Sequence, residues 1–393
     1  MIESGAESVD AQGGSTPPGE RTWNAMPLHE AVASMAGYPA RWWVSGGLAL
    51  ELHVGRAWRR HDDTDIGICR DDAGHLSTVL AGWDIVVAAN GELTPWDGGP
   101  LRRGARQNNL WCRRTPGPWE LDIVVGEGDA DRWVYRRDPM LALPWQRVVW
   151  RTSQGVPFLA PALQLLFKSV HVRPKDQTDA DTVIPVLDPA SIALLDLHLP
   201  REHPWAMQTA PRRRHIDAEE VVELLVLLTV AGVAVWVDGG WGVDALLGEQ
   251  TRPHGDLDIA VPTRDFARTH AVLADHSFVV VRDDGPYNHV LGDDVGRLVD
   301  VHAFDDSTTV LGADGIERHG PNGLAYEAGG FTGLGRIDGR PVRCMSAAFQ
   351  MRSHTGYPVD DNDWHDIANL HRRFGLPIPE DYAERIDHPP TPT

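Results

Sequence analysis

Two pairs of aspartates that stand two residues apart occur in closely similar surroundings in this chain of 393 residues. The pairs are Asp63 with Asp65 and Asp256 with Asp258. On a strand, residues two apart point to the same face, so each pair would set two carboxylates side by side. Such carboxylates repel each other unless a cation lies between them or one takes a proton, and Mg²⁺ suits an oxygen-rich group of this kind. One pair alone could be solvated at a strand edge, but its repetition favours two magnesium sites.

A single aspartate follows each pair within an apolar run. Asp122 lies in WELDIVV and Asp300 in RLVDVHAF, where a charged side chain is costly unless it is paired or binds a metal. Three carboxylates from adjacent strands can hold Mg²⁺, and the third is placed to take a proton from an attacking hydroxyl. The alternative is a strand-end aspartate that faces water. We expect Asp122 and Asp300 to be catalytic as well as metal-binding. The full set of expected metal ligands is Asp63, Asp65, Asp122, Asp256, Asp258 and Asp300.

A Gly-Gly turn stands before each aspartate pair, between an apolar strand and a helix. Glycine lets the backbone approach a ligand closely, and the N-terminus of the next helix offers unpaired N–H groups to phosphate oxygens. Most such glycines only make a tight turn, but the spacing from the second glycine to the first aspartate is the same at both places. We therefore predict that two triplets bind nucleotide: Ser45, Gly46 and Gly47, and Asp238, Gly239 and Gly240.

The elements that position these residues are repeated along the chain. Residues 42–66 align with residues 235–259 without a gap, and the aspartates, both glycines and the arginine and histidine before each pair are identical. The chain is therefore a tandem duplication, with one domain in each half.

Each copy should position its aspartates with the same order of strands and helices. A helix leads to a short apolar strand, the Gly-Gly turn and a second helix that ends near Gly55 or Gly248, and the aspartates mark two further strands. The expected leading and closing helices cover 28–37, 160–172, 178–187, 217–231, 346–353 and 363–374. Interleaved strands and helices predict an α/β (α+β) fold, with a mixed β-sheet flanked by helices in each domain.

The predicted domain bounds follow from composition. Residues 1–20 and 386–393 lack periodicity and are expected to be a disordered lead and tail. A stretch rich in proline, arginine and histidine predicts a linker over 201–216, between a first domain over 21–200 and a second over 217–385.

The charge of the chain narrows the partners that we expect. Asp and Glu number 56 against 36 Lys and Arg, so the formal net charge is −20, which would repel a nucleic-acid backbone. Three cysteines are too few and too scattered for a disulfide framework, and no apolar run reaches membrane-spanning length. We expect a cytoplasmic protein that binds neither nucleic acid nor membranes.

The order G-G, D-x-D and a later lone aspartate resembles the signature of the polymerase-β-like nucleotidyltransferase superfamily. The run DGGWGVDALLGEQTRPHGDLDIAV looks like the small antibiotic-modifying members, the aminoglycoside and lincosamide nucleotidyltransferases. The closing segments LAPALQLLFKSVHVRPKDQTDADTV and MSAAFQMRSHTGYPVDDNDWHDIANLHRRFG resemble the C-terminal helices of that family. The likeness covers about 25–190 and 217–376.

This resemblance implies two fused nucleotidyltransferase-fold domains that need Mg²⁺. They would transfer a nucleoside monophosphate, AMP from ATP or its counterpart from another nucleoside triphosphate, to a hydroxyl of an antibiotic and release pyrophosphate. The acidity of the chain favours a cationic small-molecule acceptor. Two quaternary arrangements stay open, a monomer whose halves form an intramolecular pseudo-dimer and a homodimer.

Five more side chains are candidates for nucleotide binding, each with a structural alternative. Lys168 stands where the resembled family often keeps a basic residue near the phosphates, but it could be an ordinary helix lysine. The arginines before each aspartate pair could bind phosphate or a neighbouring carboxylate. The histidines that follow them could touch phosphate or pack in the turn. These residues are Arg59, Arg252, His61, His254 and Lys168.

The two copies differ, and we expect the second to be closer to the resembled enzymes; that either copy has become a scaffold is an alternative. The first has Ser45 where the second has Asp238, and Leu48 where the second has Trp241. A non-catalytic nucleotide-binding or regulatory protein is an alternative function on the same fold, and so is an enzyme that transfers nucleotide to protein.

Overall fold

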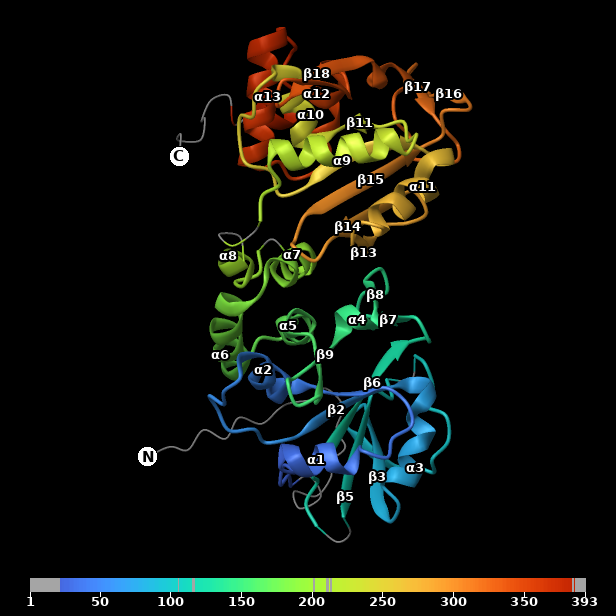
Figure 1. The fold of residues 1–393 in the computed structure, drawn as a ribbon, viewed down its shortest axis with the longest axis vertical. Helices are drawn as coiled ribbons and strands as arrows, with labels where there is room; N and C mark the ends of the chain where they lie inside the picture. The colour runs from blue at the N-terminus through green and yellow to red at the C-terminus, as the bar shows by residue number, and fades with distance from the viewer. Residues whose placement is uncertain are drawn as a thin grey trace. The chain divides into compact units, whose positions relative to one another are not determined.

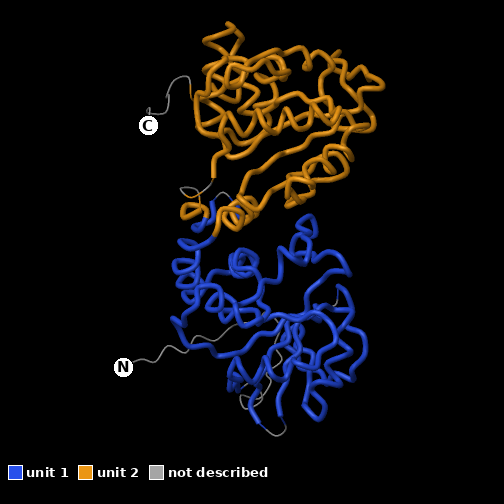
Figure 2. Tube along the Cα trace, in the orientation of Figure 1, with its two compact units in different colours: residues 1–187, 199–205 blue, residues 188–198, 206–393 orange. Residues whose placement is uncertain are grey.

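The structure is a computed structural model that describes residues 22–383 and 385, except 105, 115–116, 201, 210–211 and 213. The chain divides into two compact units, coloured separately in Figure 2. Unit 1 comprises residues 1–187 and 199–205, and unit 2 comprises 188–198 and 206–393. The expected lead and tail lie outside the described residues, and the predicted domain bounds stay a prediction.

Helix α7 (Pro189–His198) groups with unit 2, although we expected the first domain to run to residue 200. Its contacts explain the grouping. The ring of His198 lies 3.0 Å from the carbonyl oxygen of Val281, and Gly296 packs directly against Pro189.

Unit 1 is built on a mixed sheet whose strands run in the order β4-β3-β5-β6-β2-β1-β10-β9. At its centre β2 pairs with β6 in parallel and with β1 antiparallel. The strands on this path are β1 (Trp42–Val44), β2 (Asp65–Cys69), β3 (Trp83–Ala89), β4 (Glu92–Pro95), β5 (Asn109–Arg114), β6 (Leu121–Gly128), β9 (Val149–Arg151) and β10 (Pro157–Leu159). Two short strands, β7 (Arg132–Val134) and β8 (Ala142–Pro144), extend from β6.

The helices of unit 1 lie between these strands in sequence and flank the sheet (Figure 1). They are α1 (Leu28–Ser34), α2 (Gly46–Val54), α3 (Leu76–Val79), α4 (Trp145–Val148), α5 (Pro161–Ser169) and α6 (Pro174–Val183). Helix α2 begins at the Gly-Gly turn and ends at Gly55, whose left-handed backbone at φ 79° suits glycine.

Unit 2 repeats the central pattern in a sheet of order β13-β14-β15-β12-β11-β19-β18. Its strands are β11 (Trp236–Val237), β12 (Leu257–Pro262), β13 (Val279–Asp283), β14 (Asn288–Gly292), β15 (Leu298–Phe304), β18 (Gly333–Ile337) and β19 (Arg340–Cys344), beside a separate ribbon of β16 (Thr309–Leu311) and β17 (Glu317–His319). Its other helices are α8 (Ala206–Thr209), α9 (Ala218–Val230), α10 (Gly239–Leu247), α11 (Thr263–Ala274), α12 (Ala347–Ser353) and α13 (Asp361–Phe374).

The helix that follows the second Gly-Gly turn, α10, is part of the hydrophobic core of unit 2. Apolar side chains of α9, α10 and α11 pack with Val237, Ile259 and Val301 of the central strands. On its other side α10 packs through Val243 against α12 and α13. The helix that follows the Gly-Gly turn is therefore buried on two sides.

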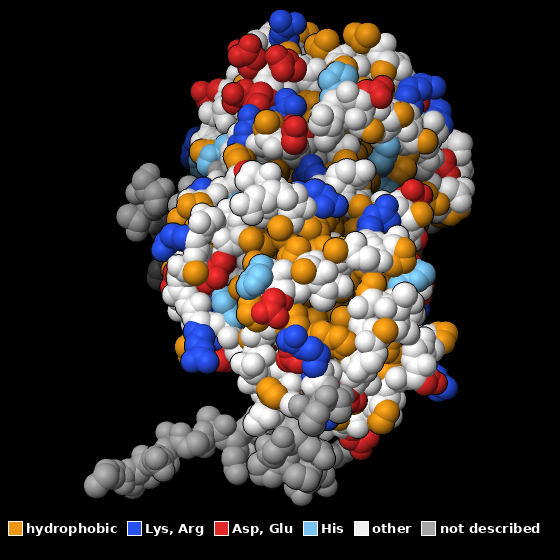
Figure 3. All heavy atoms as spheres, turned by 60° about the horizontal axis from the view of Figure 1, so that its bottom comes forward, with side chains coloured by type: hydrophobic (Ala, Val, Ile, Leu, Met, Phe, Trp, Pro, Cys, Tyr) orange, Lys and Arg blue, Asp and Glu red, His pale blue; other side chains and the backbone are white. Residues whose placement is uncertain are grey.

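The predicted α/β class with mixed sheets is confirmed. Each helix expected before or after the aspartates is present within a few residues of its predicted bounds. None of the described helices combines the length and apolar character needed to cross a membrane. On the face shown in Figure 3, acidic and basic side chains are interspersed with apolar ones.

Candidate functional site

The three aspartates of each copy lie on adjacent strands in matching register. In unit 1, Asp65 of β2 is the direct partner of Asp122 on β6. In unit 2, Asp258 of β12 is the direct partner of Asp300 on β15. Because both strand pairs are parallel, the partnered carboxylates point to the same face. The structure thus brings together the residues that we expected to share a site.

The first aspartate of each pair stands just before the strand instead of on it. Strand β2 begins at Asp65 and β12 at Leu257, so Asp63 and Asp256 belong to the preceding loops. Burial, followed by the charges of Asp122 and Asp63, raises the pKa of Asp65 well above its ordinary value. Burial, Asp256 and Asp300 do the same to Asp258. Each site therefore concentrates negative charge that a bound cation would relieve.

Packing within the protein requires glycine at the first position of each Gly-Gly turn. A Cβ on Gly46 would lie 1.9 Å from a carboxylate oxygen of Asp65, and one on Gly239 would lie 2.2 Å from the equivalent oxygen of Asp258. Both glycines also have positive φ, 67° and 56°. We expected a ligand to approach the backbone of this turn closely, and in the structure the second aspartate of the pair does so.

The second glycine of each turn makes room for the arginine and histidine. A Cβ on Gly240 would lie 2.5 Å from Arg252 Nη2 and 2.5 Å from His254 Nδ1. In unit 1, a Cβ on Gly47 would lie 2.0 Å from the equivalent arginine nitrogen. Identical glycines at both places therefore follow from identical neighbours.

The two arginines bind carboxylates of the closing helices. Arg59 donates two hydrogen bonds to Asp179 of α6, and Arg252 donates two to Asp366 of α13. The histidines contact the helix after the turn, His61 at 3.0 Å from Glu51 and His254 beside Asp244. This geometry favours the structural alternatives for all four residues, and their nucleotide-binding role stays a prediction.

Lys168 is buried, and its charge is balanced. Its ammonium group lies 2.7 Å from Asp176 and 3.1 Å from Asp179. In unit 2, His354 takes the equivalent place directly after α12, 3.7 Å from Asp366. The lysine lines the unit 1 cavity, but Asp176 and Asp179 already neutralise the ammonium charge that would attract a phosphate group.

The first residue of the turn differs between units in its partners. Ser45 caps α2 without a side-chain hydrogen bond, and the N–H of Gly46 donates to Gln164 at 2.8 Å. In unit 2 the carboxylate of Asp238 accepts hydrogen bonds from the N–H of Gly239, from Gln350 at 3.1 Å and from the Tyr326 hydroxyl at 2.9 Å. The turn of unit 2 is therefore held by a larger buried polar network.

His302 is a site residue that the sequence reasoning missed. Its Nε2 lies 3.1 Å from Asp300, and its Nδ1 lies 2.8 Å from the hydroxyl of Tyr326. Since that hydroxyl donates to Asp238, its oxygen is free to accept from His302. Burial alone would lower the pKa of His302, but the contact with Asp300 outweighs it and raises the pKa to about 9. The available signal was the H two residues after the aspartate in VDVH, on the same strand face.

The unit 2 residues fit a divalent cation. Ligand atoms of Asp258, Asp300 and His302 all lie within 4.8 Å of one another, and within the described residues this is the one group of three metal-ligating side chains so close. The contact with His302 lacks hydrogen-bond geometry, so Oδ1 of Asp300 is buried without a hydrogen-bond partner. Both carboxylates are partly buried and one has an unsatisfied oxygen, and carboxylate oxygens are the donors that Mg²⁺ prefers.

The third aspartate of unit 1 has different neighbours. The amide of Asn109 donates to both carboxylate oxygens of Asp122, at 2.9 and 3.0 Å. Val124 stands two residues after Asp122, at the position that His302 holds in unit 2, and its cross-strand partner is Asn109. Burial raises the pKa of Asp122 to about 7, although the hydrogen bond from Asn109 opposes the rise.

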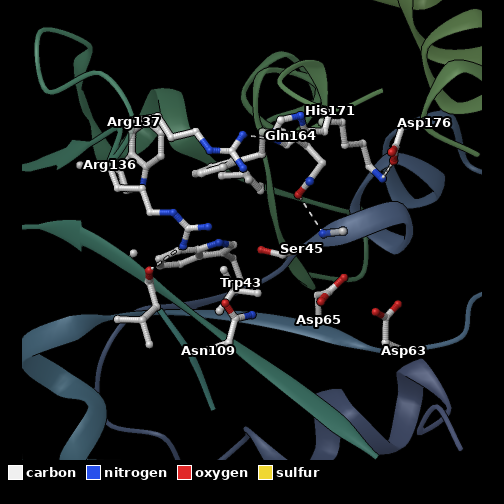
Figure 4. Close-up of a pocket in the computed structure, with 18 of the residues that line it drawn as sticks. Trp43, Ser45, Asp63, Asp65, Asn109, Arg136, Arg137, Gln164, His171 and Asp176 are labelled. Atoms are coloured by element: carbon white, nitrogen blue, oxygen red, sulfur yellow. Dashed lines mark hydrogen bonds and ion pairs between the residues drawn. The ribbon is translucent and has the colours of Figure 1, made fainter. Parts of the chain in front are cut away.

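A cavity of about 380 Å³ opens over the unit 1 carboxylates. Figure 4 shows Asp63 and Asp65 side by side at one end and the guanidinium of Arg136 reaching in above Trp43. The positively charged and histidine residues that line it are Arg136, Arg137, Lys168, His171 and Arg173. The wall of the cavity therefore carries both carboxylates and cations.

Known proteins are similar to part of this chain. A lincosamide resistance protein of Staphylococcus haemolyticus is 28% identical over 162 residues, which are 40% of this chain and 97% of that protein. A 2''-aminoglycoside nucleotidyltransferase of Escherichia coli is 28% identical over 135 residues, 33% of this chain and 70% of that protein. The lincomycin-bound crystal structure of the lincosamide antibiotic adenylyltransferase LnuA shares 28% sequence identity, with a TM-score of 0.35 and coverage of 40% of this chain and 98% of that one.

The family model described as aminoglycoside-2''-adenylyltransferase matches residues 27–93 and 220–370, which together make up more than half of the chain. The first segment carries Asp63 and Asp65, and the second carries Asp256, Asp258 and Asp300. The chain therefore belongs to the aminoglycoside-2''-adenylyltransferase family.

Proposed function

We propose that this protein transfers a nucleoside monophosphate, AMP from ATP, to a hydroxyl of a lincosamide or aminoglycoside type of antibiotic, at the unit 2 carboxylates. The observation that carries the proposal is the direct pairing of Asp258 with Asp300 on adjacent parallel strands, beside a turn that the family match includes. The relatives named above are a lincosamide resistance protein and a 2''-aminoglycoside nucleotidyltransferase, which supports this class of acceptor.

The reaction needs positioning and charge neutralisation more than covalent chemistry. The acceptor oxygen attacks the α-phosphorus, the bond from that phosphorus to the bridging oxygen breaks, and pyrophosphate leaves. The hydroxyl proton passes to Asp300, the carboxylate proposed as general base. Asp256, Asp258 and Asp300 would hold Mg²⁺, which supplies neutralisation of phosphate charge when bound.

The surrounding side chains set the geometry of this centre. His302 holds Asp300 from one side, and Tyr326 and Gln350 hold Asp238 at the start of α10. Each of these groups is fixed by a contact to another element, so little reorganisation is needed during reaction. That preorganisation supports unit 2 as the transferring unit.

The family match also favours unit 2. It runs through most of this unit, over 220–370, whereas in unit 1 it stops at residue 93, before Asp122. The net charge of −20 supports a cationic acceptor, which an acidic site would attract. We place the reaction in the cytoplasm, where ATP is available and the three unpaired cysteines would stay reduced.

The direct test incubates the full chain with ATP, Mg²⁺ and a panel of lincosamides and aminoglycosides. We expect pyrophosphate release that depends on one class of antibiotic, with an adenylyl group added to that antibiotic by mass spectrometry. Label from ATP on the protein itself, or no pyrophosphate with any member of the panel, would contradict the proposal.

A further inference from the structure

The cavity of unit 1 contains a guanidinium group, that of Arg136, that lies near carboxylates without forming an ion pair with any described residue. Within the described part of the chain Arg136 makes no ion pair; its closest polar contact is a carbonyl oxygen of Val125 at 3.4 Å, and it lies over the ring of Phe167. Burial, followed by the positive charges of Arg137 and Arg70, lowers its pKa, although Tyr135 and Glu127 oppose the fall. A partly buried cation that is repelled by its neighbours is stabilised when an anion joins it.

The other cations on the cavity wall differ in whether they already form an ion pair. Lys168 and Arg173 already pair with Asp176. Arg137 is exposed, donates to the backbone carbonyl of Phe167 and forms no ion pair with a described residue. Arg136 and Arg137 are thus the two guanidinium groups that a bound anion can use without breaking an ion pair.

Carboxylates occupy another part of the same wall. Asp63 and Asp65 line the cavity together with Ser45 and Gly46 at the start of α2 (Figure 4). A ligand that satisfies both ends must bring a divalent cation to the aspartates and negative charge to the arginines. A phosphate chain with bound Mg²⁺ has this distribution of charge, and bidentate arginine contacts suit its oxygens.

The same unit lacks the arrangement that we assign to transfer in unit 2. The amide of Asn109 donates to both oxygens of Asp122, whereas Oδ1 of Asp300 has no hydrogen-bond partner. Val124 stands in place of His302 and offers no polar contact to the site. The duplication has therefore kept the cavity while changing the residues around the third aspartate.

We infer that unit 1 binds the polyphosphate chain of a magnesium nucleoside triphosphate through Arg136 and Arg137 and does not transfer its nucleotide. The inference deepens the proposed function, because it takes unit 2 as the transferring unit. The duplicated chain would then have two nucleotide sites, and only the nucleotide bound in unit 2 would be transferred.

The test counts nucleotide bound to the full chain in the presence of Mg²⁺. The probe is α,β-methylene ATP, which cannot release pyrophosphate, measured by equilibrium dialysis. The wild-type chain should bind two equivalents. Arg136→Gln should weaken one of the two sites by about 10- to 100-fold, the range for loss of a charge-assisted hydrogen bond. Two equivalents bound with unchanged affinity in Arg136→Gln would overturn the inference.

Three further arms make the result specific. Arg151→Gln, an exposed arginine of β9 outside the cavity, is the matched control and should bind like the wild type. Arg136→Lys should restore part of the affinity, which separates loss of charge from misfolding. Tripolyphosphate should compete at the Arg136-dependent site, since the phosphate chain is the recognised part; failure to compete would contradict that recognition.

The variant Asp258→Asn tests the lack of transfer. It should keep the Arg136-dependent site while releasing no pyrophosphate from ATP with any acceptor. Continued turnover in this variant would show that unit 1 transfers and would sink the inference. Because counting bound nucleotide needs no acceptor, the binding arms remain readable even if no antibiotic proves to be a substrate.

Discussion

At the scale of single residues, each candidate site contains aspartates whose ionisation is made unfavourable by burial, namely Asp65 and Asp122 in unit 1 and Asp258 in unit 2. The pKa values of Asp65 and Asp258 are raised well above the ordinary value by burial and by the other aspartates, and that of Asp122 is raised to about 7 by burial. A carboxyl group with a raised pKa binds its proton more tightly in the folded state. Between its unfolded pKa and its folded pKa, stability therefore falls as the pH rises. For Asp122 this window runs from about 4 to about 7.

Bound Mg²⁺ should reverse this effect, because it favours the ionised carboxylates. We predict that Mg²⁺ raises the unfolding temperature more at pH 8 than at pH 6, where protons compete for the same oxygens. Thermal unfolding with and without Mg²⁺ at the two pH values measures the difference. In the double variant Asp65→Asn with Asp258→Asn the dependence on pH should disappear, and a larger shift at pH 6 in the wild type would count against both sites.

His302 gives a second prediction at this scale, because unit 1 supplies its natural counterpart. Replacing it by the residue of unit 1, His302→Val, removes the contact that holds Asp300 and the bond to Tyr326. Turnover should fall by about 10- to 100-fold, the usual effect of losing a group that orients a metal-binding carboxylate. The exposed His276→Val in the same unit is the control, and steady-state kinetics with ATP and the best acceptor make the comparison. An unchanged kcat in His302→Val would show that Asp300 needs no such support.

At the scale of elements, the Gly-Gly turn joins the sheet to the closing helices. Its first glycine lies against the aspartate of the next strand, and its second lies against an arginine that binds α6 or α13. The turn is thus the point where β11, α10 and the loop before β12 meet in unit 2. Its sequence was predicted to matter for a ligand, and the structure adds that it matters for packing.

Gly240→Ala should therefore destabilise unit 2. The new Cβ would meet Arg252 and His254 at 2.5 Å, and such overpacking costs about 1–3 kcal/mol in the free energy of unfolding. Urea denaturation followed by circular dichroism measures the loss. Gly329→Ala, where a Cβ would meet nothing within 4 Å, is the matched control and should change little. Equal stability of the two variants would refute the packing role.

The sequence predicted the elements around the aspartates because their patterns occur twice. Strands β3, β4, β5, β13 and β14 were not predicted, since they lie outside the repeated segment and have no chemistry to mark them. The register of Asp65 with Asp122 and of Asp258 with Asp300 depends on long-range strand pairing, and only their residence on adjacent strands could be expected. Asp63 and Asp256 were expected on the strands, and they precede them because β2 and β12 begin later.

The neighbours of the aspartates were harder to predict than the aspartates. His302 had a weak signal in VDVH, whereas Asn109 reaches Asp122 only through the pairing of β5 with β6. Arg136 lies beyond the repeated segment, so nothing in the duplication pointed to it. The nucleotide-binding roles of Arg59, Arg252 and Lys168 stay predictions, and their ion pairs show why a basic residue beside a motif can belong to the fold.

At the scale of the whole molecule, the duplication has produced two units of one fold whose third aspartates differ in their partners. In unit 2 Asp300 contacts His302 and keeps an unsatisfied oxygen, while in unit 1 Asp122 is capped by Asn109 beside an arginine-lined cavity. This divergence underlies our central claim that nucleotide transfer to a small molecule takes place in unit 2.

The most direct measurement compares pyrophosphate release by Asp258→Asn and Asp65→Asn, the same substitution at the same position of the two copies, with ATP, Mg²⁺ and the best antibiotic acceptor. We predict that Asp258→Asn loses at least about 100-fold in turnover while Asp65→Asn keeps most of it, since loss of a metal ligand should cost no less than loss of the group that orients it. Turnover that survives in Asp258→Asn and disappears in Asp65→Asn would contradict the account.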